Sequence, residues 1–488
     1  MNFNGSLCSY YYKLPNIEKS KFSVNASSMV KELSKQINFK IVLNNENKKN
    51  LKNLISYIFV TYVNILNYGK LKISNLNGDD KLLLEQNIND NKKNVFLPRK
   101  LNIDEYNYHK KITLIYKSLE ITTYVSSKKS TQLEKYIKQI INLMIYAMDI
   151  NFTHTKLNSI IYFVMLYESP KTLDTSKKRK IITPDEINSG STWASGFKPI
   201  NVWRTEELVK VGIHELIHCL KFDIKYYPLE ELNKYYRNFC MNTIGCGSNT
   251  SNCKYNIFPN EAYTEVIAEL YNCMFVAMSK YTKERSFVKG NKFTNDIVFN
   301  DYLKFNKNTI NSVYNNTLKY LKKEVLFGMT QISKITNYFE FEYFDDFMRD
   351  YVVQFMTENT PPISDKSSCS KTITQTTNVF SYFIVRVAIL YSLNNFFDML
   401  ESFKSDYLKH LTDEEHTNKY SKQSKFILLD PPILNVKFVE SNENIEYFTL
   451  LNIDNIKNKN FIKAIEITTS FIKKNKISEN SLRMSIVE

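Results

Sequence analysis

The spacing of apolar residues predicts both strands and helices in the first part of the chain. Short runs rich in β-branched and aromatic residues predict strands at 38–43, 112–116 and 119–125. Longer runs with helical periodicity predict helices at 51–66 and 133–149. Polar loops separate these segments, so we expect strands packed against helices.

The later part of the chain has a mainly helical pattern. Helices are predicted at 312–324, 339–356 and 376–400. The two most apolar stretches, 54–68 and 379–400, do not fit a membrane span, because the first is too short and the second contains charged residues. We therefore expect both to be buried helices.

These patterns predict an α+β fold in three parts. Residues 1–185 form an N-terminal α+β domain, residues 186–285 form a core that holds the candidate chemistry, and residues 286–488 form a mainly helical C-terminal domain. A chain of 488 residues with 43% hydrophobic residues can bury a core of this size.

Composition narrows the classes of function. The net charge of +15 favours anionic partners, but the lysines are dispersed and no nucleic-acid-binding motif accompanies them. Seven cysteines in so long a chain argue against a disulfide scaffold. The segment Met1–Pro15 has no basic region followed by an apolar one, so we expect no secretion signal.

One segment carries a pattern specific for metal chemistry. In His214-Glu215-Leu216-Ile217-His218 the histidines are four residues apart, so on a helix both imidazoles leave the same face. Two nitrogens at that separation can bind one tetrahedral zinc ion. Glu215 lies about 100° further round the helix, where it can act as general base on a zinc-bound water.

The surroundings of this motif predict a largely apolar helix over 208–220. Thr205 is the expected N-cap, with Glu206 and Glu207 in the first turn. A chance match is the alternative interpretation of the motif. The apolar neighbours argue against chance, because histidines beside a core need a partner, which a metal supplies.

A catalytic zinc takes three protein ligands, and a third must come from elsewhere. No His-x-x-Gly-x-x-His extension follows His218, which excludes the three-histidine form. Downstream, the segment 260–265 contains two glutamates, and three interpretations stay open. Glu261 is the ligand, Glu265 is the ligand, or both belong to a solvent-facing stripe with Glu269 and Asn272, since all four share one sector of a helix.

Two strands are predicted directly before the metal helix, at 187–193 and 199–203, around a glycine-containing turn. An edge strand in this place can pair with an extended polypeptide through backbone hydrogen bonds. Ser189, Gly190 and Ser191 are therefore candidate substrate-binding residues. A buried hairpin with core tryptophans is the alternative.

The motifs resemble those of gluzincin metallopeptidases. Asn260–Glu265 resembles the Asn-Glu-x-x-Ser-Asp element of thermolysin-like peptidases, which implies that Glu261 is the third zinc ligand and that Glu265 orients His214. Together with the run Arg204–His218, it also resembles predicted zincin proteins of large nucleocytoplasmic DNA viruses. The resemblance implies a Zn²⁺-dependent peptidase with a zincin-like domain, in which a mixed sheet with an edge strand accompanies a zinc helix and a glutamate helix.

The resemblance also implies a biological setting. It implies a polypeptide substrate and virion proteins as partners. It also implies a role in viral protein processing or virion assembly, and a location in host cytoplasm or virion. Two alternatives stay open: a catalytically inactive zincin-fold protein of the virion, and a zinc endopeptidase similar to the clostridial neurotoxin light chains, which share His-Glu-Leu-Ile-His.

Two further features concern the surroundings of the site. An oxyanion stabiliser is expected from the C-terminal region, and the candidates are Tyr382, Arg386 and Tyr391. Three cysteines lie between the two motifs, and their spacing does not match a standard zinc site, so they are expected to be free thiols. These are Cys240, Cys246 and Cys253. A disulfide and a small second metal site are the alternatives.

Overall fold

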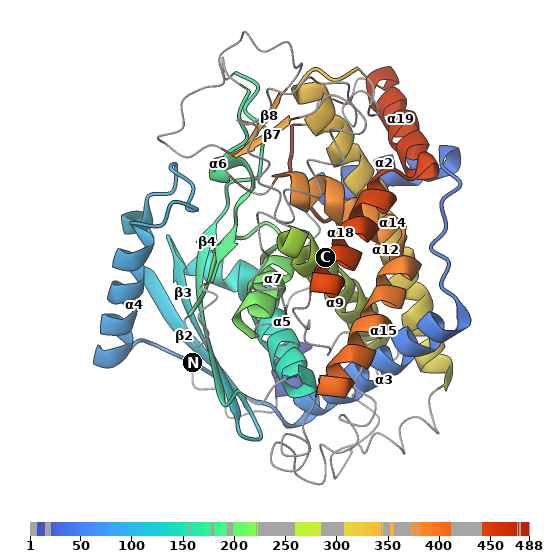
Figure 1. Cartoon of the computed structure of the whole chain (residues 1–488). Coiled ribbons are helices and arrows are strands. Elements are labelled where there is room, and N and C mark those ends of the chain that lie inside the picture. The colour runs from blue at the N-terminus through green and yellow to red at the C-terminus, as the bar shows by residue number, and fades with distance from the viewer. Residues whose placement is uncertain are drawn as a thin grey trace.

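The chain is a mixed α+β protein in which a six-stranded sheet is accompanied by a mostly helical remainder (Figure 1). It is described by a computed structural model. The α+β expectation is confirmed at this level. The described residues are 7–14, 21–154, 157–176, 180–192, 199–220, 222, 259–284, 307–342, 344, 352–355, 372–375, 377, 379–410, 442–475, 477 and 480–487.

The sheet is mixed, with strand order β1-β2-β3-β4-β6-β5. The pairs β1/β2, β2/β3 and β5/β6 are antiparallel, whereas β3/β4 and β4/β6 are parallel. The strand β5 therefore lies at an edge, next to the strand that leads into the motif helix. The strands are β1 (Lys70–Ser74), β2 (Tyr108–Tyr116), β3 (Leu119–Ser127), β4 (Ser159–Tyr167), β5 (Gly190–Ser191) and β6 (Ile200–Arg204).

Two of the three predicted N-terminal strands are confirmed. The segments 112–116 and 119–125 lie within β2 and β3, which form a hairpin whose turn places Lys117 at φ 54°, as a tight two-residue turn requires. The strand predicted at 38–43 is wrong, because this segment is irregular. Its apolar residues pack on a helix instead: the Phe39 ring stacks on Tyr391 with a centroid separation of 4.6 Å.

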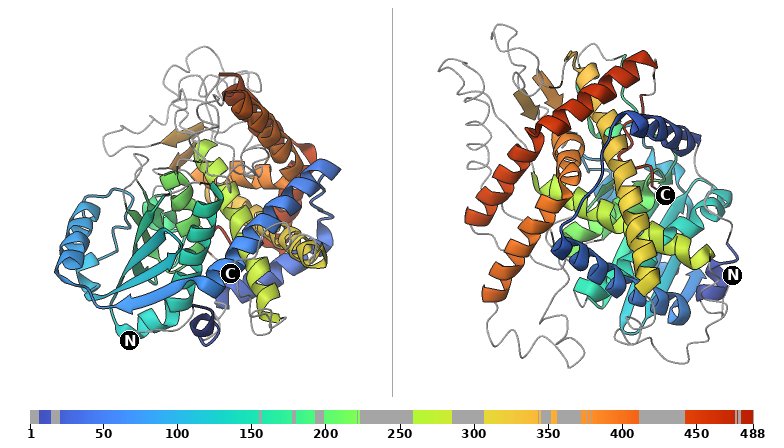
Figure 2. Two further views of the ribbon diagram at one scale, coloured as in Figure 1. Left: turned by 90° about the horizontal axis from the view of Figure 1, so that it is seen from below. Right: turned by 90° about the vertical axis from the view of Figure 1, so that its right-hand side faces the viewer.

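Helices cover both faces of the sheet (Figures 1 and 2). On one face α4 packs Leu84 against Tyr124 of β3 and Phe163 of β4. On the other face lie α5 and α7, which contact β3 and β6. The predicted helices 51–66 and 133–149 are confirmed within α3 and α5. The bounds are α1 (Leu7–Tyr11), α2 (Lys21–Gln36), α3 (Asn45–Tyr68), α4 (Gly78–Asn91), α5 (Ser130–His154), α6 (Pro184–Ile187) and α7 (Leu208–Leu220), with a 3₁₀ turn at Ile103–Glu105.

The remaining helices form a layer behind α7, in which the long helices α9 and α12 cross and pack together (Figure 2). The predicted helix 312–324 is confirmed within α12. Here the described helices are α9 (Pro259–Glu284), α12 (Lys307–Tyr338), α14 (Arg386–Tyr391), α15 (Leu393–His410), α18 (Asn442–Ile456) and α19 (Lys459–Lys474), and a π-helical turn spans Ser381–Val385.

The helix predicted at 339–356 is wrong at both ends, and residues 343 and 345–351 lie outside the described residues. The preceding helix α12 ends at Tyr338, and Glu340 has φ 63°, a left-handed conformation that stops a helix. Further on, Val352–Phe355 forms β7, which pairs in parallel with β8 (Thr372–Gln375). The β-branched residues of this stretch therefore satisfy their backbone in a strand pair.

The single helix predicted at 376–400 is also wrong, because the chain bends by 90° between Ser381–Tyr391 and Leu393–Phe403. Ser392 at the bend has φ −106° and ψ 41°, outside the helical region. Both arms are largely buried. No single helix among the described residues is long and apolar enough to cross a membrane, and this bent pair reaches that length and composition only when both arms are taken together.

The segment 480–487 crosses the interior of the protein. All eight of its residues but Asn480 are buried. Backbone hydrogen bonds join it to Lys171 and Leu173, and the carboxylate of Glu324 on α12 accepts N–H bonds from Ile486 and Val487. This segment therefore holds α12 and the segment before α6 together. Buried apolar residues from all three predicted domains form one continuous core, and the three-part division stays a prediction.

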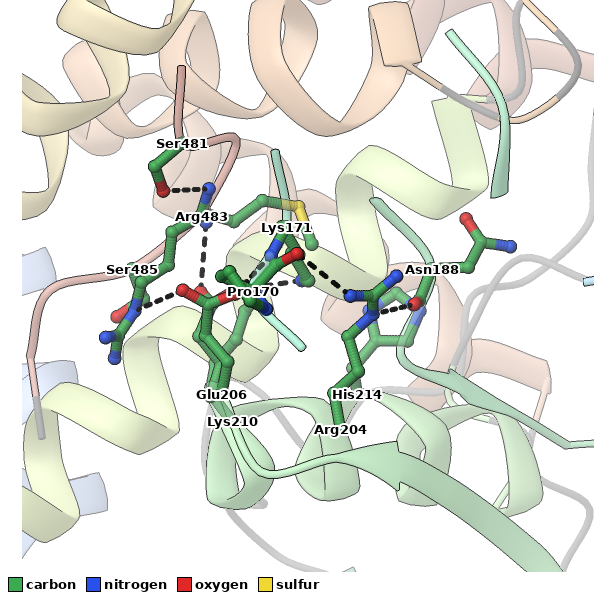
Figure 3. Close-up of polar contacts among 12 residues, drawn as sticks. Pro170, Lys171, Asn188, Arg204, Glu206, Lys210, His214, Ser481, Arg483 and Ser485 are labelled. Carbon is green, nitrogen blue, oxygen red and sulfur yellow. Dashed lines mark hydrogen bonds and ion pairs between the residues drawn. The ribbon is translucent and has the colours of Figure 1, made fainter. Parts of the chain in front are cut away.

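Arg204, the last residue of β6, clamps the chain before the edge strand (Figure 3). Its guanidinium is buried and, among the described residues, it donates to backbone carbonyls, those of Ser169, Pro170, Asp185 and Asn188, at 2.6–3.2 Å. A buried cation satisfied in this way ties two segments, 169–170 and 185–188, to the end of β6. It therefore sets the path of the chain into β5.

We expect Arg204→Met to lower the free energy of unfolding by about 3 kcal/mol or more, because four buried carbonyls lose their donor. Urea denaturation followed by circular dichroism measures the change. The matched control is Lys135→Met, which breaks the exposed Lys135–Glu168 ion pair and should cost less than about 1 kcal/mol. Equal losses in the two variants would contradict the clamp.

Candidate metal centre

The motif helix α7 begins at Leu208, two residues later than a helix capped by Thr205 would begin. The predicted cap is therefore wrong, and Glu206 and Glu207 are not in a first turn. Glu207 has φ 59°, and its carboxylate accepts from Lys171 Nζ at 2.9 Å and from Met484 N at 3.1 Å. Buried partners, rather than the helix dipole, decide where these two carboxylates lie.

His214, His218 and Glu261 bring three potential ligand atoms together. The two histidine Nε2 atoms are 3.0 Å apart, and Glu261 Oε2 lies 3.4 Å from Nε2 of His214 and 3.5 Å from Nε2 of His218. Ligands about 2.1 Å from a tetrahedral zinc are about 3.4 Å from one another. The three atoms therefore have the spacing of one face of a coordination tetrahedron, and this group can hold a metal ion.

The group is unique in the part of the chain that the structure describes: no other set of three or more histidine, cysteine, aspartate or glutamate residues converges in this way. His214 is buried, whereas 12% of the His218 side chain and 18% of the Glu261 side chain are exposed. Exposure on this side gives an ion and a water access to the three atoms.

The glutamates of α9 face the motif helix, so the solvent-facing stripe is wrong. Glu265 and Glu269 are 2% and 0% exposed. On α9 the residues Glu261, Glu265 and Glu269 are spaced four positions apart. On α7 the residues Lys210, His214 and His218 have the same spacing and lie opposite them. The two helices thus present facing rows of carboxylates and of cationic or imidazole groups.

Glu265 contacts the far side of the His214 ring. Its Oε1 lies 3.3 Å from Nδ1 of His214, and its Oε2 forms an ion pair with the buried ammonium of Lys210. Burial alone would raise the pKa of Glu265, but the charges of Lys210 and His214 hold it well below its usual range. An anionic carboxylate at Nδ1 leaves Nε2 free to face a metal ion.

Lys210 is a further residue of this site that the motif does not include, although its spacing in the sequence carries a signal. It precedes His214 by four residues, so it had to share the face of both histidines. It is 2% exposed, and a lysine on that face needs an acidic partner.

Glu215 lies beside the ligands and against the edge strand. Burial raises its pKa to about 7, although both histidines act to lower it. A Cβ atom added at Gly190 of β5 would lie 2.8 Å from both Cγ and Oε1 of Glu215. The absence of a side chain at Gly190 therefore lets the strand pass directly over this carboxyl group.

The predicted substrate-binding residues lie along this edge. Gly190 and Ser191 form β5, and Ser189 precedes it, with its carbonyl accepting from Trp203 N of β6. Ser191 Oγ accepts from Asn94 Nδ2 at 3.0 Å. Of the three, Gly190 is the one in contact with the general-base candidate, and the segment 193–198 lies outside the described residues.

Of the three oxyanion candidates, only Tyr382 reaches the metal group. Its hydroxyl donates to Glu261 Oε2 at 3.2 Å, and its ring lies on the π-helical turn, a feature common at functional sites. Arg386 is fully buried and binds Glu269 and the Met484 carbonyl, whereas Tyr391 stacks on Phe39. The cysteines at 240, 246 and 253 lie outside the described residues.

We expect the protein to bind one divalent ion and Glu261→Ala to weaken its affinity more than about a hundredfold, because a ligand is lost. Glu265→Gln keeps the ligands and should weaken affinity by about 10- to 100-fold. Competition with a coloured chelator measures both, and Glu134→Ala, on the exposed face of α5, is the control. If Glu261→Ala retains stoichiometric metal, Glu261 is not a ligand.

Comparisons with known proteins do not place this chain in a family. No protein-family model matches it, and no curated protein and no solved structure matches it at a significant level. The chemistry of the site therefore has to be argued from its own residues and distances.

Proposed function

We propose that this protein is a zinc-dependent peptidase of gluzincin type. The observation that carries the proposal is the spacing of the Nε2 atoms of His214 and His218 and of Glu261 Oε2, each 3.0–3.5 Å from the other two. Two imidazoles and one carboxylate, with a fourth position left for water, are the ligand set of a catalytic zinc. A closed structural site would instead use four protein ligands.

Zinc bound to this group would supply a Lewis acid and a water with a pKa near about 7. Glu215 accepts the proton of the attacking water and passes it to the leaving amine. Its carboxyl group is buried and has a pKa of about 7, a value that suits proton transfer in both directions. Glu265 keeps His214 in the tautomer that coordinates through Nε2.

The surrounding elements supply the other functions of a peptidase. The hydroxyl of Tyr382 lies beside the metal group, where it can exchange its bond to Glu261 Oε2 for a bond to the oxyanion that forms on the scissile carbonyl. Among the described residues β5 pairs on one side only, with β6, so its other side offers backbone groups to an extended polypeptide next to Glu215. A zincin-like domain consists of a mixed sheet with such an edge, a metal helix and a glutamate helix. The proposed zincin-like fold is based on these three components alone.

The biological setting is proposed from the motif resemblance. Processing of viral proteins or virion assembly, with virion proteins as substrates, fits a peptidase of this type. The main competing hypothesis is an inactive protein of the same fold. Glu215 favours activity, because a structural metal site has no use for a buried general base beside its ligands.

We expect Glu215→Gln to bind metal as tightly as the wild type and to lose at least about 1,000-fold in kcat, since the general base is removed while the ligands remain. A mixture of denatured proteins or a peptide library, analysed by mass spectrometry, measures hydrolysis. Wild-type protein with bound metal that cleaves none of these substrates would favour the inactive protein, and full activity in Glu215→Gln would exclude this residue as base.

We expect Tyr382→Phe to lower kcat by about 100-fold with little change in KM, because a donor to the oxyanion acts only in the transition state. Steady-state kinetics on a cleaved peptide measure the two parameters. Tyr391→Phe is the matched control, since this ring belongs to the same helix but stacks on Phe39. Parallel losses in both variants would indicate general destabilisation instead.

A further inference from the structure

The proposed site has two walls that are far apart in sequence. One wall is the edge strand β5, where Gly190 lies against Glu215. The other wall is the π-helical turn that begins at Ser381 and carries Tyr382, whose hydroxyl reaches Glu261. Proton transfer and oxyanion stabilisation need both walls to keep their distance to within a fraction of an ångström.

Asn188, two residues before β5, is the fixed point of the first wall. Its carbonyl accepts from Arg204 Nε at 2.9 Å and from Trp203 Nε1 at 3.2 Å. Figure 3 shows Asn188 beside the guanidinium of Arg204, with Pro170 on the other side. Two donors from the rigid strand β6 thus hold this residue in place.

The side chain of Asn188 reaches the second wall. Its Oδ1 accepts from the hydroxyl of Thr377 at 2.8 Å, although 189 positions separate the two residues. Thr377 is 2% exposed, so the bond is shielded from water and its loss would leave polar groups unsatisfied.

Thr377 in turn fixes the start of the helix that bears the tyrosine. Its carbonyl accepts from Val379 N at 2.8 Å, and Tyr382 follows within one helical turn. A continuous path therefore leads from Arg204 through Asn188 and Thr377 to the phenol at Glu261.

We propose that Asn188 and Thr377 are positioning residues, whose hydrogen bond holds the substrate strand and the Tyr382 turn in register across the metal site. Neither residue touches the metal group or the reacting atoms. The inference rests on the proposed peptidase function in one respect only, that Tyr382 and β5 act on the same substrate. The bond acts on the relative placement of the two walls and leaves the three metal ligands untouched.

The test compares variants that differ by one group. Thr377→Val keeps the shape of the side chain and removes the donor, whereas Thr377→Ser keeps the donor. Asn188→Leu removes the acceptor. Thr317→Val is the control for loss of a buried threonine hydroxyl, because the bond that Thr317 makes among the described residues lies within its own helix, to Val313 O at 2.9 Å.

We expect Thr377→Val and Asn188→Leu each to lower kcat by about 10- to 100-fold, with KM and metal affinity within about threefold of wild type. Thr377→Ser should keep kcat within about threefold. The double variant should lose no more than either single variant, because both remove the same bond. Equal kcat in Thr377→Val and wild type, or additive losses in the double variant, would overturn the proposal.

A second measurement does not depend on activity. Amide hydrogen exchange should become faster in Thr377→Val at both 188–191 and 379–385, and at neither segment in Thr317→Val. If the wild type cleaves nothing but this paired change appears, the peptidase proposal fails while the link between the walls stands. If the wild type cleaves peptides and the paired change is absent, the link fails by itself.

Discussion

The structure depends on one constraint, which is the neutralisation of a row of buried carboxylates between α7 and α9. The two helices are antiparallel, so Lys210 meets Glu265, and His214 and His218 meet Glu261. Removing one partner of such a buried pair costs about 3–5 kcal/mol, because the other charge is left uncompensated. A divalent ion held by His214, His218 and Glu261 would add positive charge at the open end of the row.

The same constraint explains why distant segments enter the interior. Arg386 forms an ion pair with Glu269, although burial and the neighbouring Glu324 raise the pKa of Glu269 well above its usual range. Burial also raises the pKa of Glu324 to about 7, although Arg386 acts to lower it. The segment 480–487 supplies backbone N–H groups to Glu324 and to Glu207. Its depth in the protein is therefore a consequence of the acidic groups that it satisfies, as much as of the apolar side chains that it buries.

This arrangement separates two tasks in the proposed enzyme. The four-residue spacing within α7 and α9 fixes the positions of the metal ligands. Hydrogen bonds between segments that are distant in sequence fix β5 and the π-helical turn around them. Gly190 allows the edge strand to approach Glu215, while the hydroxyl of Tyr382 contacts the ligand Glu261. The walls can thus be placed independently of the ligands, and substrate selection can change without loss of metal binding.

The sequence by itself determined what depends on helical periodicity. Spacing of four residues put His214 and His218 on one face, and the same spacing aligned Glu261 with Glu265. Tertiary structure alone decided whether that acidic face was a solvated stripe or a buried row, because periodicity is identical in both cases. It also decided the bend at Ser392, the strand at 352–355 and the choice of Tyr382 over Tyr391, since each depends on contacts between segments that no local pattern encodes.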